Sequence, residues 1–191
     1  YSWIVPPGVT NICVEAWGGG GKGGSAMIAT YGGGGGGGGA YGYDCFSVVP
    51  GTSYTLTVGG SGQASSLGTL MLANGGTNGT SATPTADGVP GIGGTSTASF
   101  NMSGEDGSAH NSGCNAINPS RGGNGANGGL GGIGATLNSS TGTNCTNYTY
   151  AQIGASPGGG GGGGRANSSS SQGALRRRGA DGADGQLIIY F

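Results

Sequence analysis

The sequence is poor in charge. Only 7% of its 191 residues are Asp, Glu, Lys or Arg, against about 25% in an ordinary soluble domain, and the net charge is −1. This balance provides no basic surface for nucleic acid or for an anionic membrane. Long apolar runs are missing too, and no segment approaches the roughly 20 residues that cross a bilayer. The chain starts at Tyr1 without a signal-peptide pattern, as expected either of a processed mature protein or of a sequence that begins partway along its chain.

Patterns typical of catalysis and metal binding are missing as well. His110 is the single histidine and is paired with no Ser or Cys nucleophile, so it is expected to be a surface residue. Asp181 and Asp184 could offer oxygens to Ca²⁺, but acidic residues are too sparse there for a calcium loop, and a solvated face is favoured. No Gly-Lys-Ser/Thr follows a glycine tract, which argues against nucleotide binding. We therefore expect no enzyme activity, no metal and no cofactor.

Cysteine is sparse but even in number. The four residues are Cys13, Cys45, Cys114 and Cys145, and none has the CxxC or Cys/His spacing of a zinc site. Two disulfides in an oxidising compartment are predicted. Of the three possible pairings, the most local joins Cys13 to Cys45 and Cys114 to Cys145. The alternative is buried free thiols in a cytosolic protein.

Six Asn-x-Ser/Thr sequons accompany the cysteines, where about two or three would arise by chance in so Ser/Thr-rich a chain. They begin at Asn78, Asn101, Asn138, Asn144, Asn147 and Asn167. Asn144 and Asn147 form a tight pair beside Cys145. Sequons and cysteines together favour secretion through a glycosylating pathway, with a location outside the cell or on a cell or virion surface.

The sequence is instead rich in glycine, which accounts for 52 residues. In GGNGANGGLGGIG, glycine recurs at positions 122, 125, 128, 131 and 134. A spacing of three matches neither an α-helix nor a β-strand, but a polyproline-II helix has three residues per turn. If every third residue lacks a side chain, a neighbouring helix can approach closely along that edge. Residues 122–134 are therefore predicted to form one internal rod whose glycines serve packing.

The same spacing recurs along the middle of the chain. It is found at Gly88, Gly91 and Gly94, and at Gly179, Gly182 and Gly185, while the tract 158–164 fits any glycine period. This regularity argues against disorder. The short, broken runs and only seven prolines argue against collagen. We predict a bundle of polyproline-II rods, whose N–H and C=O groups pair with neighbouring rods or with water.

Strand patterns lie at the two ends of the chain. Apolar or alternating segments occur at 3–7, 11–17, 41–49, 54–58, 67–73 and 186–191. We predict a mostly β and irregular fold with essentially no α-helix, in a single domain of residues 1–191. Residues 1–73 and 186–191 are expected to form a small antiparallel β-layer, and residues 74–185 the glycine-rich rods.

These end segments carry a family resemblance. The segments YSWIVPPGVTNICVEAWGGGGKGG, VVPGTSYTLTVGG, LGTLMLANGG and GADGQLIIYF resemble a glycine-rich domain of phage tail-fibre tips and of viral and microbial surface proteins. The resemblance implies glycine-rich loops that fold into packed polyproline-II helices beside a β-layer. The cysteines, the sequons and the low-charge middle depart from that pattern and favour a eukaryotic or eukaryote-virus surface protein.

Two non-enzymatic functions are expected. Ice binding is ranked below both, because it needs a flat, regular face lined by Thr or Ala, whereas the segments TSATPTA and TSTAS are irregular. The first is an extracellular structural glycoprotein, a subunit of a surface filament or coat that self-associates through edge strands and rods. The second is an adhesin for a receptor or for surface glycans. Trp3, Trp17, Tyr31, Tyr41 and Tyr43 could stack sugars, although packing near the strands is favoured. Arg176–Arg178 could be a protease site, a phosphate clamp or exposed cations that close a rod. We adopt the structural interpretation.

Overall fold

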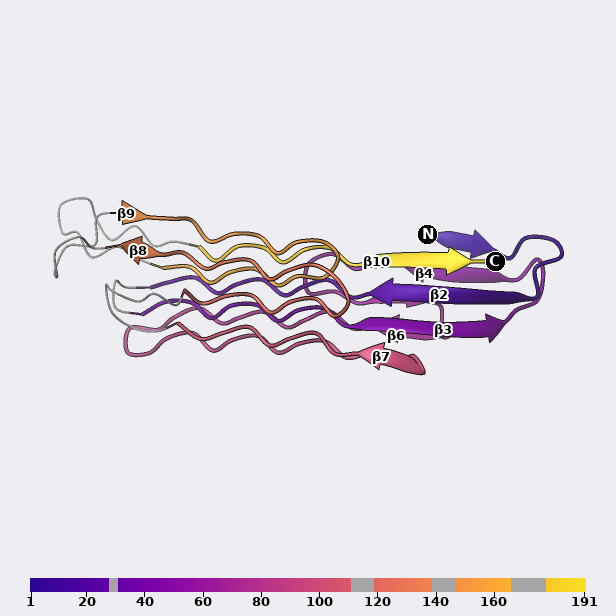
Figure 1. The fold of residues 1–191 in the computed structure, drawn as a ribbon, viewed down its shortest axis with the longest axis horizontal. Coiled ribbons are helices and arrows are strands. Elements are labelled where there is room, and N and C mark those ends of the chain that lie inside the picture. The colour runs from indigo at the N-terminus through magenta and orange to yellow at the C-terminus, as the bar shows by residue number, and fades with distance from the viewer. Residues whose placement is uncertain (28–30, 111–118, 139–146, 166–177) are drawn as a thin grey trace.

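The computed structural model describes residues 1–27, 31–110, 119–138, 147–165 and 178–191. The molecule is elongated, with most strands at one end and extended segments running to the other, and both chain termini lie at the strand end (Figure 1). The described residues form ten strands and no helix, which confirms the mostly β and irregular fold. They accordingly include no helix that is long and apolar enough to span a bilayer.

The strands build two four-stranded antiparallel sheets and one short ladder. The first sheet has the order β1 (Ser2–Ile4), β4 (Ser53–Thr57), β5 (Ser65–Leu67), β6 (Met71–Ala73). The second has the order β10 (Gln186–Tyr190), β2 (Asn11–Trp17), β3 (Tyr41–Ser47), β7 (Phe100–Met102). β8 (Leu137–Asn138) pairs with β9 (Asn147–Tyr148). The expected β-layer is thus double, because alternation along the strands gives each sheet one apolar face to bury.

The core lies where these apolar faces meet. In β2, Ile12, Val14 and Ala16 are buried, and the first sheet contributes Leu67 and Met71 to the same cluster. The other face of β2 carries Cys13, which lies directly opposite Cys45 of β3 and is joined to it by a disulfide, with the Cα atoms 4.0 Å apart. This is the predicted local pairing. Cys114 and Cys145 lie outside the described residues.

The extended segments continue from the strands as rods. Rod 18–25 follows β2, and rod 32–39 leads into β3. Their hydrogen bonds run from Gly18 N to Ala40 O, Gly21 N to Gly37 O and Gly24 N to Gly34 O, at 2.8–2.9 Å. A hydrogen bond at every third residue is the period of a polyproline-II helix. The predicted exchange of hydrogen bonds between neighbouring rods is therefore present.

The polyglycine tract 32–39 is a central rod surrounded by six others. Its N–H groups donate in turn to rods 158–164, 74–82 and 103–110, as in Gly33 to Gly164, Gly34 to Thr80 and Gly35 to Ser108. Its carbonyls accept from rods 18–25, 86–95 and 119–126, as at Gly37, Gly35 and Gly36. Positions 33–39 each face a neighbouring backbone and Gly32 faces the His110 ring, so no position along the tract has room for a side chain. Tract 158–164 is enclosed in the same way.

The hydrogen bonds place the described rods in three layers. The middle layer contains rods 86–95, 32–39, 158–164 and 149–156, in that order. One outer layer contains rods 74–82, 18–25 and 178–185, and the other contains rods 103–110, 119–126 and 128–136. Among the described rods, only 32–39 and 158–164 are enclosed on all sides. Outer rods have side chains mainly where they face solvent. Glycine therefore recurs every third residue in rod 178–185 and at about two residues in three in rods 18–25 and 128–136, which have neighbouring rods on both sides.

Residues 122–134 do not form one rod as predicted. The chain turns back at Asn127, which has a positive φ of 46°, and the two arms are antiparallel. Gly122 N donates to Gly132 O and Gly125 N to Gly129 O. The period of three runs unbroken through this turn, so the glycine spacing could not reveal the reversal.

Candidate binding surface

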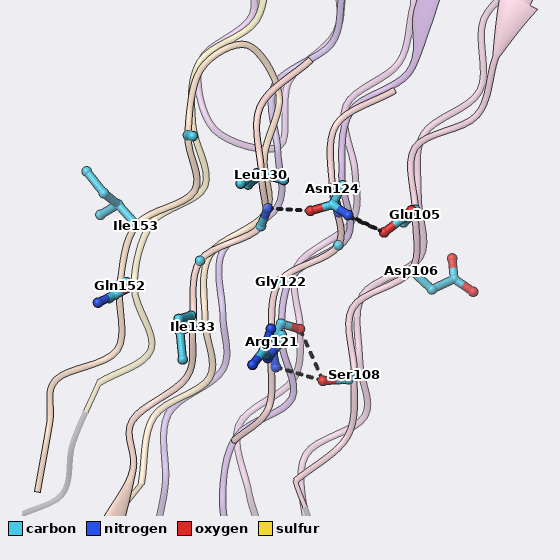
Figure 2. Close-up of a pocket in the computed structure, with 14 residues that line it drawn as sticks. Glu105, Asp106, Ser108, Arg121, Gly122, Asn124, Leu130, Ile133, Gln152 and Ile153 are labelled. Carbon is cyan, nitrogen blue, oxygen red and sulfur yellow. Dashed lines mark hydrogen bonds between the residues drawn. The ribbon is translucent and has the colours of Figure 1, made fainter. Parts of the chain in front are cut away.

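The outer layer of rods 103–110, 119–126 and 128–136 presents a grid of side chains (Figure 2). Along each rod the outward positions recur at every third residue, about 9 Å apart in a polyproline-II helix. Arg121 and Asn124 point outward from one rod, and Leu130 and Ile133 from the next. The same periodicity that places glycine inward therefore spaces these side chains evenly outward.

The polar part of this grid is held by hydrogen bonds between rods. Asn124 Nδ2 donates to Glu105 Oε2 at 2.7 Å, and Gly131 N donates to Asn124 Oδ1 at 2.8 Å (Figure 2). Arg121 N donates to Ser108 Oγ at 2.7 Å. The Asn124 side chain thus links three adjacent rods and fixes their relative heights.

A shallow groove of about 600 Å³ crosses this surface. Its lining includes Glu105, Asp106, Ser108, Arg121, Asn124, Leu130, Ile133, Gln152, Ile153 and Ala155. Leu130 and Ile153 are 70% and 71% exposed, and Ile133 is exposed as well. One side of the groove is therefore apolar and open. The Ser108 hydroxyl in the lining is hydrogen-bonded to the backbone of Arg121, and the exposed apolar side chains offer a surface that can bind a partner.

A second apolar edge lies at the far side of the bundle. Val89 and Ile92 of rod 86–95 are 64% and 65% exposed and three residues apart. Rods 86–95 and 149–156 are the two ends of the middle layer. The apolar side of the groove, formed by Leu130, Ile133 and Ile153, therefore lies on the opposite side of the bundle from this apolar ridge, and Leu130 and Ile133 are also three residues apart.

The structure brings together three of the five aromatic residues considered for sugar stacking. Trp17 and Tyr41 are buried against each other, with ring centroids 4.9 Å apart, and Tyr43 packs beside them. Trp17 Nε1 donates to Asn127 O at 3.0 Å. Trp3 belongs to the other sheet and stacks on Tyr54. Tyr31 directly precedes rod 32–39, at the opposite end of that rod from Tyr41. The sequence-based preference for packing holds for Trp17 and Tyr41.

The prediction that His110 is a surface residue is wrong. The residue is 4% exposed, and its Nδ1 lies 3.1 Å from Asp87 Oδ1, which also accepts from Gly32 N at 2.8 Å. Burial lowers the pKa of His110, the Arg165 charge lowers it further, and Asp87 opposes both. The bare backbone of Gly32 makes room for the ring, a contact between distant segments that sequence spacing cannot indicate.

The acidic repeat lies on the opposite outer layer. Asp181 forms an exposed ion pair with Lys22, 3.0 Å from Nζ to Oδ1. Within the described residues, no three His, Cys, Asp or Glu side chains are grouped to hold a metal ion. Arg178 is exposed, while Arg176 and Arg177 lie outside the described residues.

The sequons are scattered over the described chain. Asn78 is exposed, and its Oδ1 accepts from Lys22 N at 2.8 Å. Asn101 is exposed on β7, where its Nδ2 donates to Ala98 O at 2.9 Å. Asn138 and Asn147 are paired in the β8–β9 ladder. Asn144 and Asn167 lie outside the described residues.

Comparison with known proteins supports the resemblance at the level of the family. No curated protein matches the chain. The glycine-rich domain family matches residues 1–191, the whole sequence. The chain belongs to the family of glycine-rich domains.

Proposed function

We propose that this chain is a structural component of an extracellular surface, where copies associate side by side into a coat or filament. The observation that carries this proposal is the pair of apolar surfaces on opposite sides of the bundle, one on rod 86–95 and the other on rods 128–136 and 149–156. The ridge of Val89 and Ile92 matches the groove beside Leu130, Ile133 and Ile153 in period and in chemistry.

A second copy of the chain is the occupant that this groove fits best. Ridge and groove are different surfaces of one molecule, so their contact is heterologous, and such a contact propagates without closing when no rotation brings it into a ring. Parallel rods would interlock at a common repeat of about 9 Å. Five of the exposed large apolar side chains lie on these two surfaces of the rods, which makes their alignment informative.

An extracellular location accords with the other features. The Cys13–Cys45 disulfide is typical of oxidising compartments, and the sequons would supply glycans on the exposed surface. In this proposal the protein is a glycoprotein whose rods need few charges, because backbone hydrogen bonds hold them together.

Complementary variants test the lateral contact. Leu130→Asp places a charge in the apolar groove and leaves the ridge unchanged. Ile92→Asp places a charge on the ridge and leaves the groove unchanged. Sedimentation velocity and negative-stain microscopy should show concentration-dependent arrays for the unmodified chain and monomers for each variant alone. An equimolar mixture should stop at one-to-one dimers, since only one competent ridge and one competent groove remain.

The matched control is Val49→Asp, which alters an exposed apolar residue in the loop between β3 and β4. This variant should assemble like the unmodified chain. A chain that stays monomeric at high concentration, or variants that assemble normally, would contradict the lateral contact.

An adhesin is the second candidate, favoured because both termini lie at the strand end of the molecule, opposite the far ends of the rods (Figure 1). Any support joined to either terminus would leave the rods projecting away from it, as in the fibre tips that the sequence resembles. A glycan array probed with the purified chain tests this function. Reproducible binding that competes with soluble glycan would favour it, and an empty array would count against it.

A further inference from the structure

The outer face of the second sheet surrounds one carboxylate with aromatic side chains. In the strand register, Glu15 of β2 lies between Tyr43 of β3 and Ile188 of β10. Directly paired side chains of this kind lie about 5 Å apart. The neighbouring row on the same face adds Trp17 and Tyr41. Glu15 is therefore the charged centre of a largely apolar face.

Two tyrosines reach Glu15 diagonally across the strands. Tyr41 Oη donates to Glu15 Oε1, and Tyr190 Oη donates to Glu15 Oε2, both at 3.2 Å. Hydrogen bonds from hydroxyls to carboxylates are ordinarily about 2.5–2.7 Å long, so these two are weak. A carboxylate has about four acceptor sites, and Glu15 retains capacity for a further partner.

The charge of Glu15 has no cation beside it in the described part of the chain. Lys22 pairs with Asp181, and His110 lies beside Asp87, both on the rods. Burial, followed by the Glu15 carboxylate, raises the pKa of Tyr41, and the same two causes act on Tyr190. A half-buried anion among aromatic rings loses hydration without gaining a counter-charge.

We propose that this face binds a quaternary ammonium group, such as the trimethylammonium of a choline-type ligand. Such a group is weakly hydrated, carries the charge that Glu15 lacks and presents methyl groups to aromatic rings, the chemistry of aromatic ammonium sites. Trp17 and Tyr41 are buried, so the rings open to a ligand are those of Tyr190 and Phe100, which are 49% and 58% exposed, and of half-buried Tyr43. A hard cation such as Ca²⁺ would need six or more oxygen ligands, which one carboxylate and phenols do not supply.

A pair of ligands with the same shape tests the proposal without altering the protein. Choline chloride and its neutral isostere 3,3-dimethyl-1-butanol are titrated separately at constant ionic strength, with ¹H–¹⁵N spectra recorded on the full chain. Choline should shift the amide resonances of Glu15, Tyr43 and Ile188 and bind at least about tenfold more tightly than the isostere. Equal binding of the two, or no shift at these residues, would overturn the proposal.

Two matched variants locate the charge that is recognised. Glu15→Gln keeps the side-chain volume and an acceptor for the tyrosines, and it should weaken choline binding at least about tenfold. Asp181→Asn removes one carboxylate charge from the exposed surface of the bundle and should leave binding unchanged. Because neither assembly edge includes Glu15, choline binding by monomeric Leu130→Asp would separate this site from the proposed lateral contact. Unaltered binding by Glu15→Gln would refute the assignment.

Discussion

Replacing Gly36 with alanine tests whether the polyglycine rods hold the fold together. Gly36 lies within the enclosed tract 32–39, against rod 18–25. A Cβ there would lie 2.7 Å from the carbonyl oxygen of Lys22 and closer still to the carbonyl of Gly21. Both obstacles are backbone atoms, so no side-chain rotation relieves the overlap, and rod 18–25 must move.

The magnitude follows from the hydrogen bonds that this movement stretches. Three join the two rods, from Gly18 N to Ala40 O, Gly21 N to Gly37 O and Gly24 N to Gly34 O. Each contributes about 1 kcal/mol net, so about 3 kcal/mol is lost. Alanine returns about 0.4–1 kcal/mol by restricting the unfolded chain, which leaves a loss of about 2–3 kcal/mol. At about 2–4 °C per kcal/mol, Tm should fall by about 4–12 °C.

Urea and thermal unfolding followed by circular dichroism would measure this loss. Gly60→Ala is the control, because its nearest neighbour beyond the adjoining residues would be Asp184 Oδ1 at 3.7 Å. That variant should be unchanged or stabilised by up to about 1 kcal/mol. If Gly36→Ala is as stable as Gly60→Ala, the tight contacts around the central rod do not determine stability.

Three further predictions concern the Cys13–Cys45 disulfide and the titrating groups of His110 and Asp44. Replacing both Cys13 and Cys45 by serine should destabilise the fold by about 3–4 kcal/mol in urea unfolding, as expected for a sequence separation of 32 residues. His110 has a lowered pKa, so the unfolded chain takes up its proton first and stability is lost as pH falls below 6.5. The hydrogen-exchange protection factor of the Gly32 amide should fall there, and His110→Gln should remove that dependence. Hydrogen bonds from the backbone and side chain of Ser99 lower the pKa of Asp44. Its contribution is present above pH 3.8 and lost below, and thermal unfolding of Asp44→Asn should lack this acid dependence.

The sequence predicts what depends on local period. Alternation in residues 11–17 indicates β2, and the every-third glycines indicate rods that pack through bare edges. The same period does not indicate the direction in which the chain runs. Residues 122–134 were therefore predicted to form one rod, although the chain reverses at Asn127. The period also does not indicate which segments lie side by side in the fold. The burial of His110 depends on Asp87 and Gly32, 23 and 78 residues earlier in the chain, and the Glu15 surroundings depend on Tyr190 at the opposite end.

The two four-stranded sheets set the register of the rods, in addition to holding the ends of the rods together. Trp17 pairs with Tyr41 in the second sheet, and the next hydrogen bond, Gly18 N to Ala40 O, belongs to the bundle. A slip of one residue between β2 and β3 would therefore displace rods 18–25 and 32–39 by the same amount. Glycine recurs every third residue on the outer rods, so such a slip would direct side chains into neighbouring backbones. The Cys13–Cys45 disulfide joins directly paired positions of these two strands. By excluding that slip covalently, it fixes the register on which the packing of the glycine rods depends.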